Sequence, residues 1–240
     1  MIGKTGSESN GGIGGSMSFS IAIDGPAGAG KSTIAKKIAK ERNLIYVDTG
    51  AMYRAMALYL LRAGISDQDS EAISEKCKSA DITIQYEKGE QLVYLNGENV
   101  TPFLRTEEVG KMASASSVNG DVRKKLVQLQ QKLAEQADVI MDGRDIGTCV
   151  LPGANVKIYL TASVEVRARR RYDELIAKGE KWDLEEIKRE IAQRDHRDMT
   201  RDISPLRQAQ DAILLDTSHM DIPEVIATII KICEEKCGWK

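Results

Sequence analysis

Cysteine, histidine and aromatic residues are scarce in this sequence, and long apolar runs are missing. Four cysteines in 240 residues (Cys77, Cys149, Cys233 and Cys237) are too few and too scattered for the disulfide framework of a small secreted domain. Two histidines argue against a histidine-rich metal site. No apolar run reaches the roughly 18 residues that a membrane-spanning helix requires. We therefore expect reduced thiols, a cytoplasmic protein and no membrane partner.

Cys233 and Cys237 are four residues apart, so we expect them to share one face of the last helix. Two thiols at this spacing can contribute to a metal site, but the sequence has no second pair that would complete it. We interpret both cysteines as small apolar residues of that helix.

A strong net charge of either sign is also missing. The formal net charge is −2 and the isoelectric point is about 5.9, so no bulk attraction draws the chain to nucleic acid or to an anionic membrane. We expect small-molecule substrates, no nucleic-acid partner and a monomer. Residues 1–16 are rich in Gly and Ser without periodic apolar spacing, which predicts a flexible tail before a natural start near Met17.

The rest of the chain, 17–240, alternates short apolar strands with helices. The expected strands are Phe19–Asp24, Leu44–Val47, Val139–Met141, Val156–Leu160 and Ile213–Leu215, and the expected helices include Gly30–Arg42, Ala51–Arg62 and Pro223–Glu235. This rhythm predicts a three-layer α/β fold, a parallel sheet flanked by helices on both faces. Within Ile82–Val100, turn signals at Lys88–Gly89 and Asn96–Gly97 predict a small antiparallel β-rich insertion.

A glycine-rich segment between the first strand and the first helix fits the pattern G-x-x-x-x-G-K-[ST]. Glycines let backbone N–H groups turn toward a phosphate without a Cβ clash, and the helix that follows directs its positive end at the same oxygens. Lys31 can reach the β- and γ-phosphates, and the Ser32 hydroxyl can bind Mg²⁺. The predicted ATP-binding residues of this P-loop are Gly25, Pro26, Ala27, Gly28, Ala29, Gly30, Lys31, Ser32 and Thr33.

Arginines occur in several clusters along the rest of the chain. The guanine-reading Asn-Lys-x-Asp and the switch Asp-x-x-Gly of GTPases are both absent, whereas a kinase of a small acceptor needs arginines that neutralise two polyanions. The candidates are Arg54 after Asp48-Thr49-Gly50, Arg144 after Asp142-Gly143, the run Arg167, Arg169, Arg170 and Arg171, and the group Arg194, Asp198 and Arg201. The last group has i, i+4, i+7 spacing, which predicts one shared helical face. Each cluster alone is also compatible with solvated ion pairs.

Four longer motifs follow one another along the chain: IDGPAGAGKST at 23–33, DTGAMYR at 48–54, DGRDIGT at 142–148 and RDHRDMTRDISPL at 194–206. In these motifs and their spacing the chain from Phe19 to its end resembles the bacterial cytidylate kinases. The resemblance implies a P-loop nucleoside monophosphate kinase that transfers phosphate from ATP to CMP and dCMP in pyrimidine metabolism. It also implies a monophosphate-binding insertion at about 50–135 and a helical lid at about 170–183.

The same resemblance assigns roles to single residues. It implies a CMP site of Thr49, Tyr53, Arg54, Ser114, Arg123, Arg144, Asp145, Arg194, Asp198 and Arg201, and a catalytic set of Lys31, Arg144, Arg171 and Arg201. Arg170 would stack on adenine, and Asp142 would order Mg²⁺ through water, although a turn-capping carboxylate is an alternative for Asp142. A carboxylate at Asp145 would accept from the cytosine amino group, where uracil has a carbonyl, so Asp145 is expected to select C over U.

We expect direct in-line transfer, in which the protein supplies position and charge rather than a covalent intermediate. Two alternatives remain at this point. One is a kinase of another small acceptor, such as AMP, dTMP or shikimate. The other is a regulatory P-loop NTPase that hydrolyses ATP slowly and signals to a partner.

Overall fold

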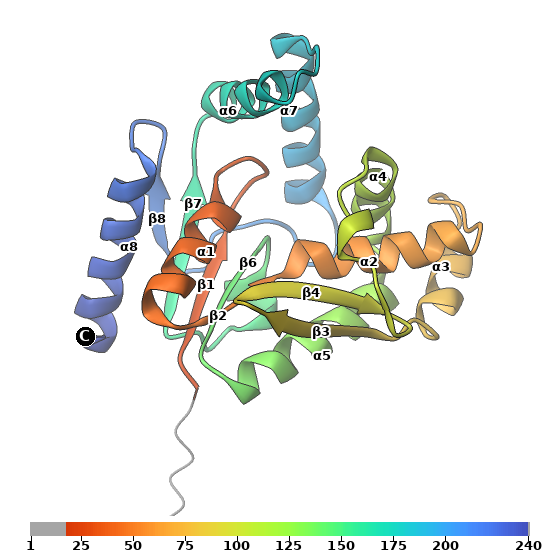
Figure 1. The fold of residues 1–240 in the computed structure, drawn as a ribbon, viewed down its shortest axis with the longest axis horizontal. Coiled ribbons are helices and arrows are strands. Elements are labelled where there is room, and N and C mark those ends of the chain that lie inside the picture. Colours follow the sequence, from red (N-terminus) through yellow and green to blue (C-terminus); the bar gives the residue numbers. More distant parts are fainter. Residues whose placement is uncertain (1–17, 240) are drawn as a thin grey trace, which may run out of the picture.

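A central parallel sheet organises the chain. The computed structural model describes residues 18–239, so the predicted tail at 1–16 and the predicted start near Met17 lie outside the described residues. The sheet has five parallel strands in the order β2-β6-β1-β7-β8 (Figure 1). They are β1 (Ser20–Asp24), β2 (Ile45–Asp48), β6 (Val139–Gly143), β7 (Val156–Thr161) and β8 (Ile213–Asp216). All five correspond to strands that the sequence predicts.

The two faces of the sheet bury separate cores, because successive side chains of a strand point to opposite faces. Ile21 and Ile23 of β1 pack with α1 (Lys31–Arg42) and α8 (Ile222–Cys237). Ala22 lies in the other core, with α2 (Thr49–Arg62) and α5 (Gly120–Gln136). The predicted three-layer arrangement is therefore confirmed.

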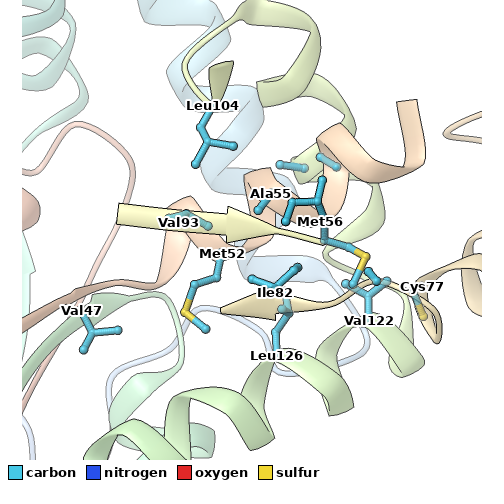
Figure 2. Packing of buried hydrophobic residues seen from close by; sticks show 14 of the residues in the cluster. Val47, Met52, Ala55, Met56, Cys77, Ile82, Val93, Leu104, Val122 and Leu126 are labelled. Atoms are coloured by element: carbon cyan, nitrogen blue, oxygen red, sulfur yellow. The ribbon is translucent and has the colours of Figure 1, made fainter. Parts of the chain in front are cut away.

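A second, antiparallel sheet is inserted between the α2 and α5 segments. It contains β3 (Ile82–Glu87), β4 (Glu90–Leu95) and β5 (Glu98–Asn99), flanked by α3 (Ser70–Cys77), a 3₁₀ turn (Thr101–Phe103) and α4 (Glu107–Ser116). Both connecting turns use positive φ at two successive residues: 53° and 79° at Lys88–Gly89, and 50° and 83° at Asn96–Gly97. The predicted insertion is confirmed, and Figure 2 shows its Ile82 and Val93 packed with Met52 of α2 and Leu126 of α5.

Two further helices form a separate pair at the top of Figure 1. They are α6 (Val164–Ala177) and α7 (Leu184–Thr200), and they pack through Ala168, Leu175, Ile187 and Ile191. The range 170–183 predicted for the lid covers the second half of α6 and the connection to α7.

The cysteines of α8 differ in burial. Cys233 lies in the core with β1 and α1, whereas Cys237 at the helix end is exposed. Among residues 18–239, no three His, Cys, Asp or Glu side chains are grouped closely enough to hold a metal by themselves. In the same range, none of the helices combines the length and apolar character needed to span a bilayer.

Candidate active site

The glycine-rich segment forms a tight loop between β1 and α1. Gly25, Gly28 and Gly30 have φ of 147°, 75° and 91°, in the region that side-chain-bearing residues avoid. A Cβ on Gly25 would lie 1.9 Å from the carbonyl oxygen of Leu160 on β7, so this position requires glycine. Gly30 caps α1, so the loop leads directly to a helix N-terminus, where a polyphosphate is favoured by free N–H groups and the helix dipole. The loop conformation therefore fits the predicted nucleotide.

Lys31 opens α1 and is buried beneath this loop. Its Nζ donates to the carbonyl oxygen of Pro26 at 2.8 Å, and the residue is only 5% exposed. Burial, aided by the positive charge of Arg144, lowers the pKa of Lys31 well below its usual value. An anion that enters the loop would therefore stabilise the charged form of Lys31.

Asp142, at the end of β6, accepts hydrogen bonds on both carboxylate oxygens. Ser32 donates to Oδ2 and Tyr46 donates to Oδ1, each at 2.8 Å. Burial and the nearby charge of Asp48 raise the pKa of Asp142. A serine hydroxyl beside a carboxylate is an oxygen donor set that suits Mg²⁺, which keeps several waters and needs few protein ligands. Ser32 and Asp142, the pair predicted for the metal, are therefore adjacent.

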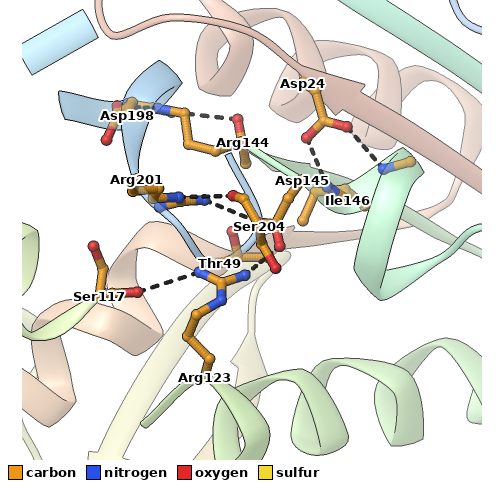
Figure 3. A network of polar contacts seen from close by, with 12 residues as sticks. Asp24, Thr49, Ser117, Arg123, Arg144, Asp145, Ile146, Asp198, Arg201 and Ser204 are labelled. Atoms are coloured by element: carbon orange, nitrogen blue, oxygen red, sulfur yellow. Dashed lines mark hydrogen bonds and ion pairs between the residues drawn. The ribbon is translucent and has the colours of Figure 1, made fainter. Parts of the chain in front are cut away.

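A buried ion pair lies on the acceptor side of the site. Arg123 of α5 donates to Asp145, which follows β6 (Figure 3). Both side chains are less than 10% exposed. The Arg123 guanidinium also bonds the carbonyl oxygen of Ser117 at 3.3 Å and lies 5.8 Å from the centre of the Tyr53 ring. Arg201 is 3.7 Å from Asp145. The structure thus brings together Arg123 and Asp145, which were predicted to read the base, and Arg201, which was predicted to hold the phosphate.

A cluster of cationic side chains surrounds this pair. The Nε of Arg144 donates to Asp198 at 2.8 Å. Burial opposes ionisation of Asp198, but the charge and hydrogen bond of Arg144 hold its pKa below the usual range. Burial together with Arg144 lowers the pKa of Arg194 to about 10. Within the described residues, the buried Nε of Arg194 and Nη2 of Arg201 have no hydrogen-bond partner, which leaves donors for an anionic ligand.

The predicted helical face ends at Arg201. Helix α7 runs to Thr200 and Arg201 is its C-cap: its N–H still bonds the carbonyl oxygen of Arg197 at 3.2 Å and its φ of −65° is helical, whereas its ψ of 142° turns the following chain away. Its Nε donates to the carbonyl oxygen of Ser204 at 2.7 Å, so the loop after the helix directs this side chain. Arg194 and Asp198 do lie on α7, as predicted.

Comparison with known proteins identifies the family to which these residues belong. The family model for cytidylate kinase matches residues 21–235. The chain belongs to the cytidylate kinase family. The cytidylate kinases of Caldicellulosiruptor bescii and Bacillus subtilis (strain 168) are 51% and 48% identical to it, over 89% and 91% of this chain and 95% and 97% of their own. A solved structure of an uncharacterized protein from Eubacterium ventriosum, 14% identical with a TM-score of 0.50, covers 90% of this chain and 98% of its own, a likeness in fold alone.

Three other residues were predicted for the acceptor site of this cytidylate kinase family member: Arg54, Thr49 and Ser114. Arg54 lies against Gly50, since its Nη1 would be 3.3 Å from a Cβ there. Thr49 is 4% exposed and donates to the carbonyl oxygen of Asp142 at 2.7 Å. Ser114 is half-buried on α4, but in this region Arg123 donates to the carbonyl oxygen of Ser117 instead.

The arginines of α6 have different surroundings from one another. Arg170 donates to the carbonyl oxygen of Thr217 at 2.8 Å, next to β8. Arg171 is exposed and pairs with Glu174 one turn further along the helix. The predicted roles of Arg170 and Arg171 toward the nucleotide stay predictions.

Two residues of the site, Asp24 and Arg167, make contacts that were not predicted from the sequence. Asp24 accepts the N–H groups of Ile146 and Gly147, each at 2.7 Å, and burial raises its pKa to about 6 despite these bonds. Arg167, buried at the start of α6, donates to the carbonyl oxygen of Ala27 at 2.9 Å and pairs with Asp195 of α7 at 2.6 Å. For Asp24 the only local signal was its position directly before the first glycine, whereas Arg167 belongs to the arginine run that the sequence singled out.

Proposed function

We propose that this protein phosphorylates CMP and dCMP with ATP as the phosphate donor. The observation that carries the proposal is the buried pair of Arg123 and Asp145 beside the cationic cluster. The cytosine edge has an amino donor next to ring and carbonyl acceptors, and a carboxylate beside a guanidinium complements both. Membership of the cytidylate kinase family supports the same acceptor.

The acceptor phosphate is held by Arg54, Arg144 and Arg201. Planar guanidinium groups match phosphate oxygens in pairs and remain charged at any working pH. Within residues 18–239, the buried Nε of Arg194 and Nη2 of Arg201 have no hydrogen-bond partner, although Arg201 Nη2 lies 3.7 Å from Asp145, and these donors support the assignment. Arg194 and Asp198 reach the sugar hydroxyls, while Thr49, Tyr53 and Ser114 complete the pocket, in which Asp145 and Arg123 read the base.

The donor phosphates lie in the P-loop, residues 25–33. Lys31 and Arg171 neutralise the charge that moves with the phosphoryl group, and Arg170 stacks on adenine. Mg²⁺ would be ligated by Ser32 and held through water by Asp142, and when bound it supplies further neutralising charge. Because the acceptor is already an anion, the reaction requires no strong general base.

The segment 50–135 binds the monophosphate, and the lid at 170–183 closes over the donor. Closure excludes water, which would otherwise accept the phosphoryl group. We further propose that the enzyme acts in the cytoplasm as a monomer, without a nucleic-acid partner. Size-exclusion chromatography with light scattering tests the monomer, and a mass of twice 26.4 kDa would contradict it.

The experiment that tests the function is coupled ADP release with Mg-ATP and a panel of acceptors: CMP, dCMP, UMP, AMP, dTMP and shikimate. Turnover with CMP and dCMP that exceeds UMP and the rest is the expected result. Turnover with a different acceptor would keep the P-loop kinase and reject the base-reading pair. Equal ADP release with and without acceptor would indicate an NTPase. The variant Arg144→Ala should lower both kcat and CMP affinity.

A further inference from the structure

The Asp142 carboxylate is held from two sides by hydroxyl groups of different origin. The proposed function gives Ser32, which holds Oδ2, a place at the metal. The second hydroxyl, on Tyr46, holds Oδ1 at the same 2.8 Å and has no role in the reaction described so far. Asp142 is therefore held by one hydroxyl with a proposed place at the metal and by one, on Tyr46, without such a place.

Tyr46 reaches Asp142 from the neighbouring strand. It lies on β2, which pairs in parallel with β6 so that Asp48 is opposite Asp142, and its ring is 6% exposed in the core beneath α1. A phenylalanine would fill the same apolar space, since the two rings differ only by the hydroxyl group. The packing of this core thus needs the ring, whereas the hydroxyl serves the carboxylate.

We infer that Tyr46 is a positioning residue that orients Asp142 for the magnesium-bearing nucleotide. Ser32 would bind the metal through its hydroxyl, and the bond from Tyr46 to Oδ1 would then hold the Asp142 carboxylate in its present orientation. Mutation of the outer partners of metal-ligating side chains typically costs 10- to 100-fold in metal affinity or activity, and we expect the lower end for Tyr46 because Asp142 would hold the metal through water. The inference rests on the proposed roles of Ser32 and Asp142, but it does not depend on which acceptor is phosphorylated.

The chain offers a matched control for this hydroxyl. Tyr86 of β3 is half-buried, and its hydroxyl donates to the backbone oxygen of Tyr46 at 3.1 Å. Tyr86→Phe therefore deletes a hydroxyl that contacts Tyr46 and leaves the bond from Tyr46 to Asp142 in place. Any general loosening of β2 against the insertion should appear in this variant as well.

The test is calorimetric titration of ADP into the wild-type protein, Tyr46→Phe and Tyr86→Phe over a series of Mg²⁺ concentrations. ADP affinity without Mg²⁺ should be the same in all three proteins, because the P-loop contacts are unchanged. The Mg²⁺ concentration that gives half of the gain in ADP affinity should rise about 10-fold in Tyr46→Phe and stay at the wild-type value in Tyr86→Phe. Thermal unfolding of each variant verifies that it is folded.

A wild-type Mg²⁺ requirement in Tyr46→Phe would overturn the inference. An equal shift in Tyr86→Phe would overturn it too, because packing rather than the bond to Asp142 would then be the cause. Acceptor turnover is measured separately. If the wild type does not phosphorylate CMP but Tyr46→Phe still requires more Mg²⁺, the proposed function is rejected and the role of Tyr46 is retained.

Discussion

The carboxylate of Asp24 accepts the N–H of Gly147 at 2.7 Å, although the two residues are 123 positions apart in the sequence. The other oxygen of the same carboxylate accepts the N–H of Ile146 at the same distance. Asp24 is the last residue before the phosphate loop, and Ile146 directly follows Asp145. One buried side chain therefore connects the loop proposed for the donor to the residue proposed to read the acceptor base.

Asp24→Asn should weaken the acceptor site more than the donor site. The amide accepts one of the two N–H groups and turns its own NH₂ toward the other, which leaves a buried donor unmatched and costs about 1–3 kcal/mol. We expect the KM for CMP to rise about 10-fold and the KM for ATP to change about 3-fold or less. Asp211→Asn, which alters a carboxylate that is 62% exposed, is the surface control. Equal rises in both KM values would contradict the coupling.

The pH dependence of stability gives a second test of Asp24. Its pKa is about 6 in the folded protein and 3.8 for an unperturbed aspartate carboxyl, so the folded state holds the proton more tightly. Stability from this proton is present below pH 3.8 and is lost as the pH rises through 6. Between pH 4 and 7, the unfolding free energy of the wild type should therefore fall by roughly 2–3 kcal/mol relative to Asp24→Asn. The measurement is urea unfolding of both proteins at several pH values. An unfolding free energy that depends on pH in the same way in both would refute this.

The sheet and the phosphate loop could be predicted because their signals are local. Each central strand is a short apolar run, and the glycine spacing of residues 25–30 reflects backbone angles within the loop itself. The same local reasoning reaches only as far as Arg201, the C-cap of α7, because its ψ of 142° ends the helical path of the chain. The bond from Arg201 to Ser204 belongs to the loop that follows, and no periodic pattern reveals it.

Contacts between distant segments could not be predicted from the sequence in this way. The bonds of Asp24 to Ile146 and Gly147 depend on β1 lying next to β6, a strand order that no short motif encodes. The pair of Arg167 and Asp195 likewise depends on α6 packing on α7. The resemblance to a family supplied Arg123 and Asp145 as members of one site, whereas spacing alone, 22 positions, did not.

Nucleotide binding should be accompanied by proton uptake at Lys31. Burial lowers its pKa from 10.5 to about 7, and a bound polyphosphate favours the charged form and raises the pKa again. Calorimetry of ADP binding at pH 8, in buffers of different ionisation enthalpy, should therefore show uptake of a fraction of a proton. The uptake should vanish at pH 6, where Lys31 is already charged, and in Lys31→Met. Uptake of the same size in Lys31→Met would assign the proton to another group.

Asp145→Asn should reduce the preference for CMP over UMP. An amide can turn its NH₂ toward the uracil carbonyl, whereas the carboxylate can only accept, so the variant should lose affinity for CMP and tolerate UMP. We expect the ratio of kcat/KM for CMP to kcat/KM for UMP to fall at least about 10-fold, which corresponds to the free energy of a hydrogen bond to a charged group. Asn is chosen over Ala because complete removal of the carboxylate would leave the buried Arg123 unpaired, at a cost of about 3–5 kcal/mol.

Asp198→Asn is the matched control for this change in selectivity. Asp198 pairs with Arg144, and in the proposed site it contacts the sugar rather than the base. Its amide variant should lower kcat/KM for CMP and UMP by the same factor, because both acceptors carry the same ribose and phosphate. A change of selectivity in Asp198→Asn that equals the change in Asp145→Asn would show that the charge of the cluster, rather than the hydrogen-bonding edge of Asp145, discriminates between the bases.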